Sequence, residues 1–270
     1  MSDDLSDGSD DFLQKGFLGE SAKLAIPALR RPLTSWFELV ELVSAVLQTS
    51  LLNASRTVRG TSKDPAVLGT FVAFRSAHSL QAAILLAERG LITETRLLVR
   101  SLIENAFCMA ALVTNPQEFL ARFEEDAVAS RKGLAGVILK KEIASPGSPD
   151  EAKVKAALVS FGKAKLMSID DLADLGPLRK QYLLYRVISN DAAHPSATSL
   201  SRHMDVKPDK SGWIGYVSGP ALEPERRQTL NDLALTAISI VVGFTELIAD
   251  IKGNAEISEL SERYQKLRLA

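Results

Sequence analysis

Three charged residues spaced four apart are the first candidates for chemistry. Arg96, Arg100 and Glu104 are the only charged residues between positions 95 and 117, in a stretch that is otherwise apolar. At helical periodicity this spacing places them on one stripe of a single helix. Because an unpartnered charge in an apolar interior is very costly, these side chains must find partners elsewhere in the chain.

A second polar set surrounds His194, at the end of a predicted helix. Arg186, Asn190 and His194 recur at a spacing of four, and Ser189 precedes Asn190. The dipole at a helix C-terminus favours a protonated histidine, and histidine exchanges protons near neutral pH. We therefore expect the two sets to meet in one polar cluster. The candidate catalytic residues are His194, Arg100 and Glu104, and the candidate binding residues are Ser189, Asn190, Arg186 and Arg96.

The same residues also have a purely structural interpretation. Arg100 and Glu104 can form a buried ion pair that ties two helices together, while His194 caps its own helix and bonds Glu104. On a helix surface an arginine four residues before a glutamate adds only about 0.2–0.5 kcal/mol, so a surface role explains the pair poorly. Of the other histidines, His78 is expected to be a satisfied core residue and His203 to be solvated.

Composition excludes several classes of site. The 270 residues include 32 basic and 33 acidic side chains, so net charge gives no global case for binding nucleic acid or an anionic membrane. Cys108 is the only cysteine, which excludes an intrachain disulfide and fits a reducing cytoplasm. The sequence contains no zinc-type or carboxylate–histidine metal motif and no glycine-rich phosphate loop. We expect neither a metal nor a cofactor.

Hydrophobic periodicity predicts an all-α bundle of about seven to nine helices. Residues 91–115 should form a buried central helix, since their apolar side chains cover most of the helix circumference. A long irregular excursion near 196–222 should contain a short hairpin at Trp213–Val217. The other predicted helices span 34–59, 65–89, 117–143, 151–165, 178–194, 224–252 and 255–269.

The ends of the chain and its most apolar stretch complete the predicted organisation. Residues 1–11 are rich in Asp, Ser and Gly, which predicts a disordered acidic tail before a single helical domain at 12–270. The tail lacks the basic and apolar segments of a signal peptide. The uncharged stretch 233–245 has only 13 residues, whereas spanning a membrane takes about 20. We therefore expect a buried helix there, no membrane partner and a cytoplasmic location.

The segments RSLIENAF and SNDAAHPS resemble those of a widespread, uncharacterised family of helical bacterial proteins. Members of that family are similar in a helix with R-x-x-x-E and a later helix ending in S-x-x-x-x-H. The matching residues are Arg100, Glu104, Ser189 and His194, and the resemblance covers about residues 35–250. It implies a helical fold and no settled activity.

SNDAAH also resembles the HEPN superfamily of helical ribonucleases and defence toxins. That superfamily has arginine, often followed by asparagine, at this distance before histidine; here Ser189 stands where it has arginine. The resemblance implies an arginine that steadies phosphate and a histidine that assists proton transfer, usually across a homodimer. In this chain Arg186 or Arg100 would have to supply the positive charge.

Three functions remain open from the sequence. The favoured one is a non-catalytic binding or interaction module, whose polar cluster holds a small anion, a nucleotide or a partner peptide. The alternative is a HEPN-like, metal-independent ribonuclease of a toxin or phage-defence system, in which His194 moves a proton and arginine stabilises charge on phosphorus. The third is a cluster that is purely structural. Exposure of the cluster discriminates among them, and the sequence leaves enzymatic activity undecided.

Overall fold

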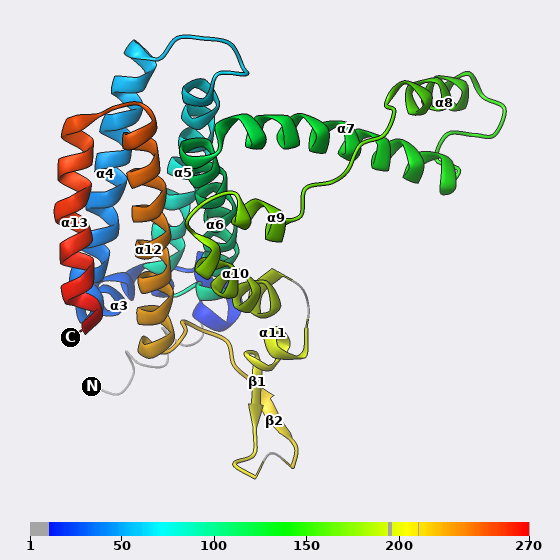
Figure 1. Cartoon of the computed structure of the whole chain (residues 1–270). Helices are drawn as coiled ribbons and strands as arrows, with labels where there is room; N and C mark the ends of the chain where they lie inside the picture. The colour runs from blue at the N-terminus through cyan, green and yellow to red at the C-terminus, as the bar shows by residue number, and fades with distance from the viewer. Residues whose placement is uncertain (1–10, 194–195, 210, 270) are drawn as a thin grey trace, which may run out of the picture.

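The computed structural model describes residues 11–193, 196–209 and 211–269. Within them the protein is an all-α bundle with one two-stranded sheet, which confirms the predicted fold class (Figure 1). Twelve α-helices occur in these ranges because the chain before residue 34 and between residues 169 and 201 divides into short helices. The six longest helices are α4 (Thr34–Thr57), α5 (Pro65–Ala87), α6 (Ile92–Thr114), α7 (Pro116–Lys140), α12 (Glu223–Leu247) and α13 (Ile251–Leu269).

Helix α12 lies at the centre of the bundle and packs against α4, α5, α6 and α13. Helix α6 is buried over most of its circumference, as its sequence predicted, and Leu102, Ile103 and Phe107 lie fully inside the core. Burying such side chains stabilises a fold by about 1.5–3 kcal/mol each. The polar residues of α6 are therefore held on a rigid element.

The connection between α5 and α6 is short and sharply defined. Helix α5 begins at Pro65, and the amide of Ala66 donates to the side chain of Asp64 at 2.9 Å. Gly90 has φ +79°, a conformation that glycine adopts without strain and that ends the helix. Helix α6 starts two residues later, so the two helices pack as an antiparallel pair.

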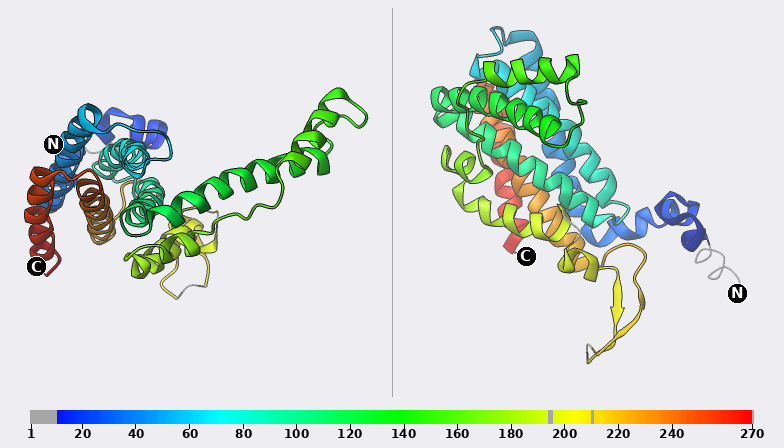
Figure 2. Two further views of the ribbon diagram at one scale, coloured as in Figure 1. Left: turned by 45° about the horizontal axis from the view of Figure 1, so that its top comes forward. Right: turned by 90° about the vertical axis from the view of Figure 1, so that its right-hand side faces the viewer.

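Helices α7 and α8 (Pro149–Ser160) form an arm that extends away from the bundle (Figure 2). Only Phe119, Ala129 and Ala135 of α7 are buried, and α8 buries no residue. The chain then returns through α9 (Ile169–Asp174), which packs against α6. Most of α7 therefore lies outside the core.

The helix predicted at 178–194 is wrong as a single element. The chain forms a 3₁₀ turn at Arg179–Gln181, then α10 (Tyr182–Ile188), then a π-helix at Ser189–Ala193. A π turn accommodates one more residue than an α turn and occurs mostly at functional or strained positions. Periodicity alone does not reveal it. His194, which was expected to end this helix, lies outside the described residues.

The C-terminal helices also differ from the prediction in their boundaries. Helix α12 ends at Leu247 instead of continuing to residue 252, because Ala249 adopts φ +53° and breaks the helical path. Asp250 then accepts hydrogen bonds from the amide of Gly253 at 3.1 Å and from Ser50 Oγ at 2.7 Å. These bonds start α13 at Ile251 and tie its first turn to α4.

The excursion at 196–222 contains a short helix and a hairpin. Helix α11 (Ala197–Ser201) precedes strands β1 (Met204–Val206) and β2 (Trp213–Tyr216), which pair antiparallel. The hairpin was predicted within Trp213–Val217, which is too narrow: these residues contain only its second strand, and the first strand lies at Met204–Val206. Both strands are largely exposed and project from one end of the bundle (Figure 1).

The N-terminal segment is more regular than expected. It forms η1 (Gly16–Leu18), α2 (Glu20–Leu24), α3 (Ile26–Arg30) and η2 (Arg31–Leu33), where no element was assigned from the sequence. Of the predicted acidic tail, residues 1–10 lie outside the described residues. Asp11 is fixed: it pairs with Lys15 at 2.8 Å and accepts from the amide of Ser21 at 2.9 Å, and these bonds lower its pKa.

Three helical spans within the described residues are long and apolar enough to cross a membrane, judged by length and composition alone. They are Ile26–Thr57, Ile92–Thr114 and Glu223–Leu247. The 13-residue stretch considered in the sequence is therefore an underestimate, because the third span extends well beyond it on both sides. Inside the bundle 56%, 50% and 61% of the respective apolar windows are buried.

Candidate functional site

The predicted polar residues gather where α6 faces α10 and the π-helix. Helix α6 supplies Arg96 and Arg100 one turn apart, and the opposite segment supplies Tyr185, Ser189 and Asp191. The hydrophobic residues of α6 anchor the helix in the core, so its polar stripe has a fixed position. Two separate sets of interactions result, one around Arg96 and the other around Arg100.

The first set, here called the ion network, consists of Arg96, Asp191, Arg202 and Glu225. Arg96 Nη1 donates to Asp191 Oδ2, and Arg96 Nε donates to Thr229 Oγ1 at 3.0 Å. Arg202 approaches the same carboxylate through two atoms, Nε to Oδ1 at 2.8 Å and Nη2 to Oδ2 at 2.7 Å. Its remaining nitrogen, Nη1, donates to Glu225.

The ion network is buried at Arg96 and Asp191, more exposed at Glu225, and balanced in charge. The side chains of Arg96 and Asp191 are only 11% and 12% exposed. Burial opposes the charge of Arg202, but the hydrogen bonds and negative charges of Asp191 and Glu225 raise its pKa. Two guanidinium groups face two carboxylates, so the network leaves no excess charge. It joins α6, the π-helix, the end of α11 and α12.

The second set, here called the Arg100 cluster, consists of Arg100, Glu104, Tyr185 and Ser189. Arg100 Nε donates to Ser189 Oγ at 2.9 Å, and its Nη2 donates to the Tyr185 hydroxyl at 2.8 Å. The same Nη2 lies 3.2 Å from Glu104 Oε1. The guanidinium also lies over the Tyr185 ring, 5.0 Å from its centroid.

The Arg100 cluster is half-open to solvent. The side chains of Arg100 and Glu104 are 30% and 25% exposed. The expectation that both would be fully buried is wrong, because α6 has a partly open edge between α5 and α10. A guanidinium in this position can bind an anionic group that competes with Glu104. Within the described residues, Glu104 forms no ion pair other than the one with Arg100.

Of the remaining candidate residues, two are exposed and one lies outside the described residues. Arg186 and Asn190 are exposed, and Ser196 Oγ donates to the carbonyl of Asn190 at 2.7 Å. His194 lies outside the described residues, so its predicted bond to Glu104 stays a prediction. The expectation for His78 is wrong: it lies on an exposed face of α5 and not in the core. His203 is exposed, as expected.

Sequence reasoning missed the residues that complete both sets. Tyr185 and Asp191 lie in the segment singled out from the sequence, but neither was assigned a role. A signal for Asp191 existed, since buried Arg96 requires an acid and Asp191 is the only acidic residue between positions 175 and 204. No comparable signal marked Arg202 or Glu225. Arg202 follows the short helix α11 in an irregular region, and Glu225 lies in the first turn of α12, where acidic residues are common.

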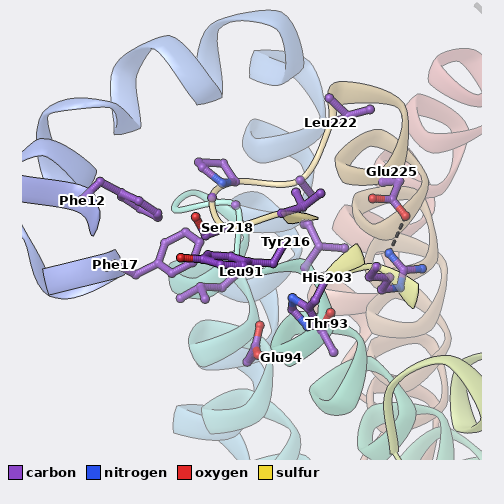
Figure 3. Close-up of a pocket in the computed structure, with 18 of the residues that line it drawn as sticks. Phe12, Phe17, Leu91, Thr93, Glu94, His203, Tyr216, Ser218, Leu222 and Glu225 are labelled. Atoms are coloured by element: carbon purple, nitrogen blue, oxygen red, sulfur yellow. Dashed lines mark hydrogen bonds and ion pairs between the residues drawn. The ribbon is translucent and has the colours of Figure 1, made fainter. Parts of the chain in front are cut away.

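A pocket of about 690 Å³ opens beside the ion network (Figure 3). Its lining comes from three parts of the chain that are distant in sequence: residues 12–17, residues 90–94, and residues 202–203 together with 216–225. Arg202 and Glu225 belong both to the network and to the pocket lining. The wall opposite them is aromatic and apolar, with Phe12, Phe17 and Leu91 among its residues.

Short backbone contacts fix the walls of this pocket. The amide of Ala221 donates to the carbonyl of Gly90 at 3.3 Å, and a side chain at Gly90 would meet Pro220, since an added Cβ lies 2.5 Å from Pro220 Cβ. Arg226, which is buried, donates Nε to the carbonyl of Ala221 at 3.0 Å and Nη1 to that of Leu29 at 2.6 Å. The connection into α12 is thereby held against the turn before α6.

The described residues contain no group of three His, Cys, Asp or Glu side chains that could hold a metal ion. Cys108 is also a poor nucleophile. Burial raises the pKa of its thiol to about 12, and the negative charge of Glu104 acts in the same direction. Since the thiolate is the reactive form, Cys108 is not an activated nucleophile.

Comparison with known proteins gives one family. A family model described as a family of unknown function (DUF5677) matches residues 67–211, more than half of the chain. The matched region runs from α5 into the hairpin loop and contains the Arg100 cluster and three of the four network residues. No curated protein and no solved structure matches. The match is consistent with the predicted uncharacterised family, whereas the R-x-x-x-E and S-x-x-x-x-H motifs attributed to that family and the HEPN resemblance stay predictions.

Proposed function

The chain belongs to DUF5677, a family of unknown function, and from the geometry of its own residues we propose that it is a non-catalytic binding module for a small ligand. The binding site is the pocket lined by residues from the segments 12–17, 90–94, 202–203 and 216–225. The proposal does not require a nucleophile or a bound metal.

The pocket itself is the observation that carries this proposal. Its volume of about 690 Å³ lies within the range of about 300–1,000 Å³ typical of small-molecule sites. Such sites combine apolar walls with a few polar groups, and this pocket pairs Phe12, Phe17 and Leu91 with polar groups such as Thr93, His203 and Ser218. The pocket also opens between separate segments of the chain, a common location for ligand sites.

The ion network supports the proposal by giving the pocket a rigid side. Arg202 is held at three nitrogens by Asp191 and Glu225, so its position is fixed on the pocket wall. A preformed wall lowers the entropic cost of binding. The same saturation argues against acid–base work by these residues, since their charges are already committed to one another.

A fragment screen with a blocking variant tests the proposal. Ligand-observed NMR should detect binding of small apolar fragments to the wild type. Ser218→Trp places an indole in the pocket and should abolish that binding, while the melting temperature without ligand stays the same. The control is Ser211→Trp, at an exposed position in the hairpin loop that does not line the pocket. Binding that persists in Ser218→Trp, or an absence of hits, would refute the proposal.

One contact favours a second candidate, the metal-independent cleavage of RNA. Arg100 reaches across from α6 and donates to Ser189, the residue that stands where the HEPN superfamily has arginine. Its half-exposed guanidinium is therefore available to a phosphate near that position. In this candidate Arg100 would stabilise charge on phosphorus, His194 would transfer the proton, and Glu104 would orient Arg100.

The two candidates give opposite results in one assay. Incubation of the wild type with single-stranded RNA and excess EDTA should leave the RNA intact if the protein is a binding module. Cleavage that disappears in Arg100→Ala and in His194→Ala, but persists in Arg56→Ala, would establish the second candidate. Arg56 is the appropriate control because it is exposed on α4 and forms no ion pair with the described residues.

A further inference from the structure

The pocket contains one charged group without a counterion. Glu94 lies on the pocket lining in the first turn of α6, and its carboxylate makes no ion pair or hydrogen bond with the described residues. The other charged lining residues, Arg202 and Glu225, neutralise each other and continue into the ion network. The uncompensated charge of the pocket is therefore negative.

The aromatic side chains of the pocket suit a cation as well. Phe12, Phe17 and Tyr216 all line it (Figure 3). Phe12 and Phe17 pack edge to face with centroids 5.2 Å apart, so they present a fixed aromatic surface. The face of an aromatic ring attracts alkylammonium and quaternary ammonium groups, and cages of several rings bind them together with a nearby carboxylate.

The N-terminus of a helix favours an anion instead, but its partial positive charge is smaller than the full negative charge of Glu94. The N-terminus of α6 lies at the pocket and carries about half a positive charge. One of the amides of its first turn is already occupied, since that of Ile92 donates to the carbonyl of Gly90 at 3.0 Å. The full negative charge of Glu94 in the same turn outweighs what remains.

We propose that the ligand of this pocket is an organic cation, an amine or quaternary ammonium group carried on an apolar body. The inference rests on the proposed binding function and adds the chemical class. The carboxylate of Glu94 balances the charge of the ligand, the aromatic rings contact the ammonium group, and Leu91 and Leu222 contact the apolar part.

Three probes that share a benzyl group test the charge preference. Benzyltrimethylammonium is the cation, neopentylbenzene is its uncharged carbon isostere, and phenylacetate is the anion. Dissociation constants are measured by NMR titration of the full chain at pH 8. The cation should bind at least about tenfold more tightly than the isostere, the size expected for a cation–π contact supported by a carboxylate. Phenylacetate should bind more weakly than either.

Two variants assign the preference to residues. Glu94→Gln should lower the affinity for the cation about five- to tenfold and leave that for neopentylbenzene unchanged, because only the charge is removed. Tyr216→Leu should weaken binding of the cation more than binding of the isostere. The control is Glu259→Gln, at an exposed position of α13 away from the pocket, and it should change neither.

The outcomes separate this inference from the function on which it rests. If neopentylbenzene or phenylacetate binds as tightly as the cation, the chemical class is wrong while the pocket remains a binding site. If the cation preference is unchanged in Glu94→Gln, the inference is also overturned. If none of the three probes binds and the fragment screen gives no hits, both the inference and the proposed function fail.

Discussion

Asp191 and Arg202 form a two-point ion pair, with Nε to Oδ1 at 2.8 Å and Nη2 to Oδ2 at 2.7 Å, and Arg96 donates to the same carboxylate. Asp191 lies in the π-helix, Arg202 at the end of α11 and Arg96 on α6. A single carboxylate thus holds three elements together, and one of its partners lines the pocket.

Replacing this carboxylate should destabilise the protein strongly. Asp191→Ala removes the ion-pair partner of the buried Arg96 side chain, which should lower the free energy of unfolding by about 3–5 kcal/mol. Urea unfolding followed by circular dichroism measures the change. Asp205→Ala, at an exposed position of β1, is the control and should change stability by less than about 0.5 kcal/mol. A loss below about 1 kcal/mol in Asp191→Ala would contradict the network.

The two arginines of α6 should differ in their cost of removal. Arg96 is 11% exposed and bonds to Asp191 and Thr229, whereas Arg100 is 30% exposed and its neighbours can turn to water. We expect Arg96→Ala to cost about 3–5 kcal/mol and Arg100→Ala only about 1–2 kcal/mol. Urea unfolding under the same conditions measures both losses in the free energy of unfolding. Equal losses would contradict the difference in burial between Arg96 and Arg100.

Asp232 should make stability fall as pH rises. Burial raises the pKa of this carboxyl group in the folded state, although hydrogen bonds from Asn231 and Gln228 and the charge of Arg96 oppose the shift. The unfolded pKa of aspartate is about 3.9, so the contribution of Asp232 is present below about pH 4 and is lost as pH rises through the folded pKa. Asp232→Asn should therefore gain stability relative to the wild type between about pH 4 and pH 7. Urea unfolding of both proteins at several pH values in this range measures the gain. If the difference in the free energy of unfolding between Asp232→Asn and the wild type did not change with pH, the prediction would be refuted.

Gly90 should tolerate no side chain. Its φ is +79° and an added Cβ would lie 2.5 Å from Pro220 Cβ, so Gly90→Ala should cost about 1–3 kcal/mol and displace one wall of the pocket. Gly133→Ala is the matched control, since Gly133 is helical and has open space around it; that variant should gain about 0.5–1 kcal/mol. Thermal unfolding of the two variants decides the matter, and a neutral Gly90→Ala would contradict the close contact.

The sequence predicts the fold well where long helices have a clear pattern of apolar residues. Residues 91–115 were predicted to be central because apolar side chains surround them, and α6 occupies 92–114. The failures lie where local structure depends on tertiary partners. The π-helix at Ser189–Ala193 accompanies the bonds that Asp191 makes to two distant arginines, and no local pattern encodes those partners.

The candidate site could be predicted only in part. Arg100, Glu104 and Ser189 do meet, as their spacing and apolar surroundings indicated. Arg96 belongs to a different set, since one turn of α6 separates a buried position from a half-open one. The pocket was not predicted, because its walls come from three separate segments that only the folded chain brings together.

Hydrogen–deuterium exchange with a bound fragment tests the central claim most directly. A saturating hit from the fragment screen should slow amide exchange in residues 90–94 and 216–222, which line the pocket, and leave residues 97–104 and 185–190 unchanged. Protection confined to residues 97–104 and 185–190 would instead assign binding to the Arg100 cluster and contradict the proposed pocket.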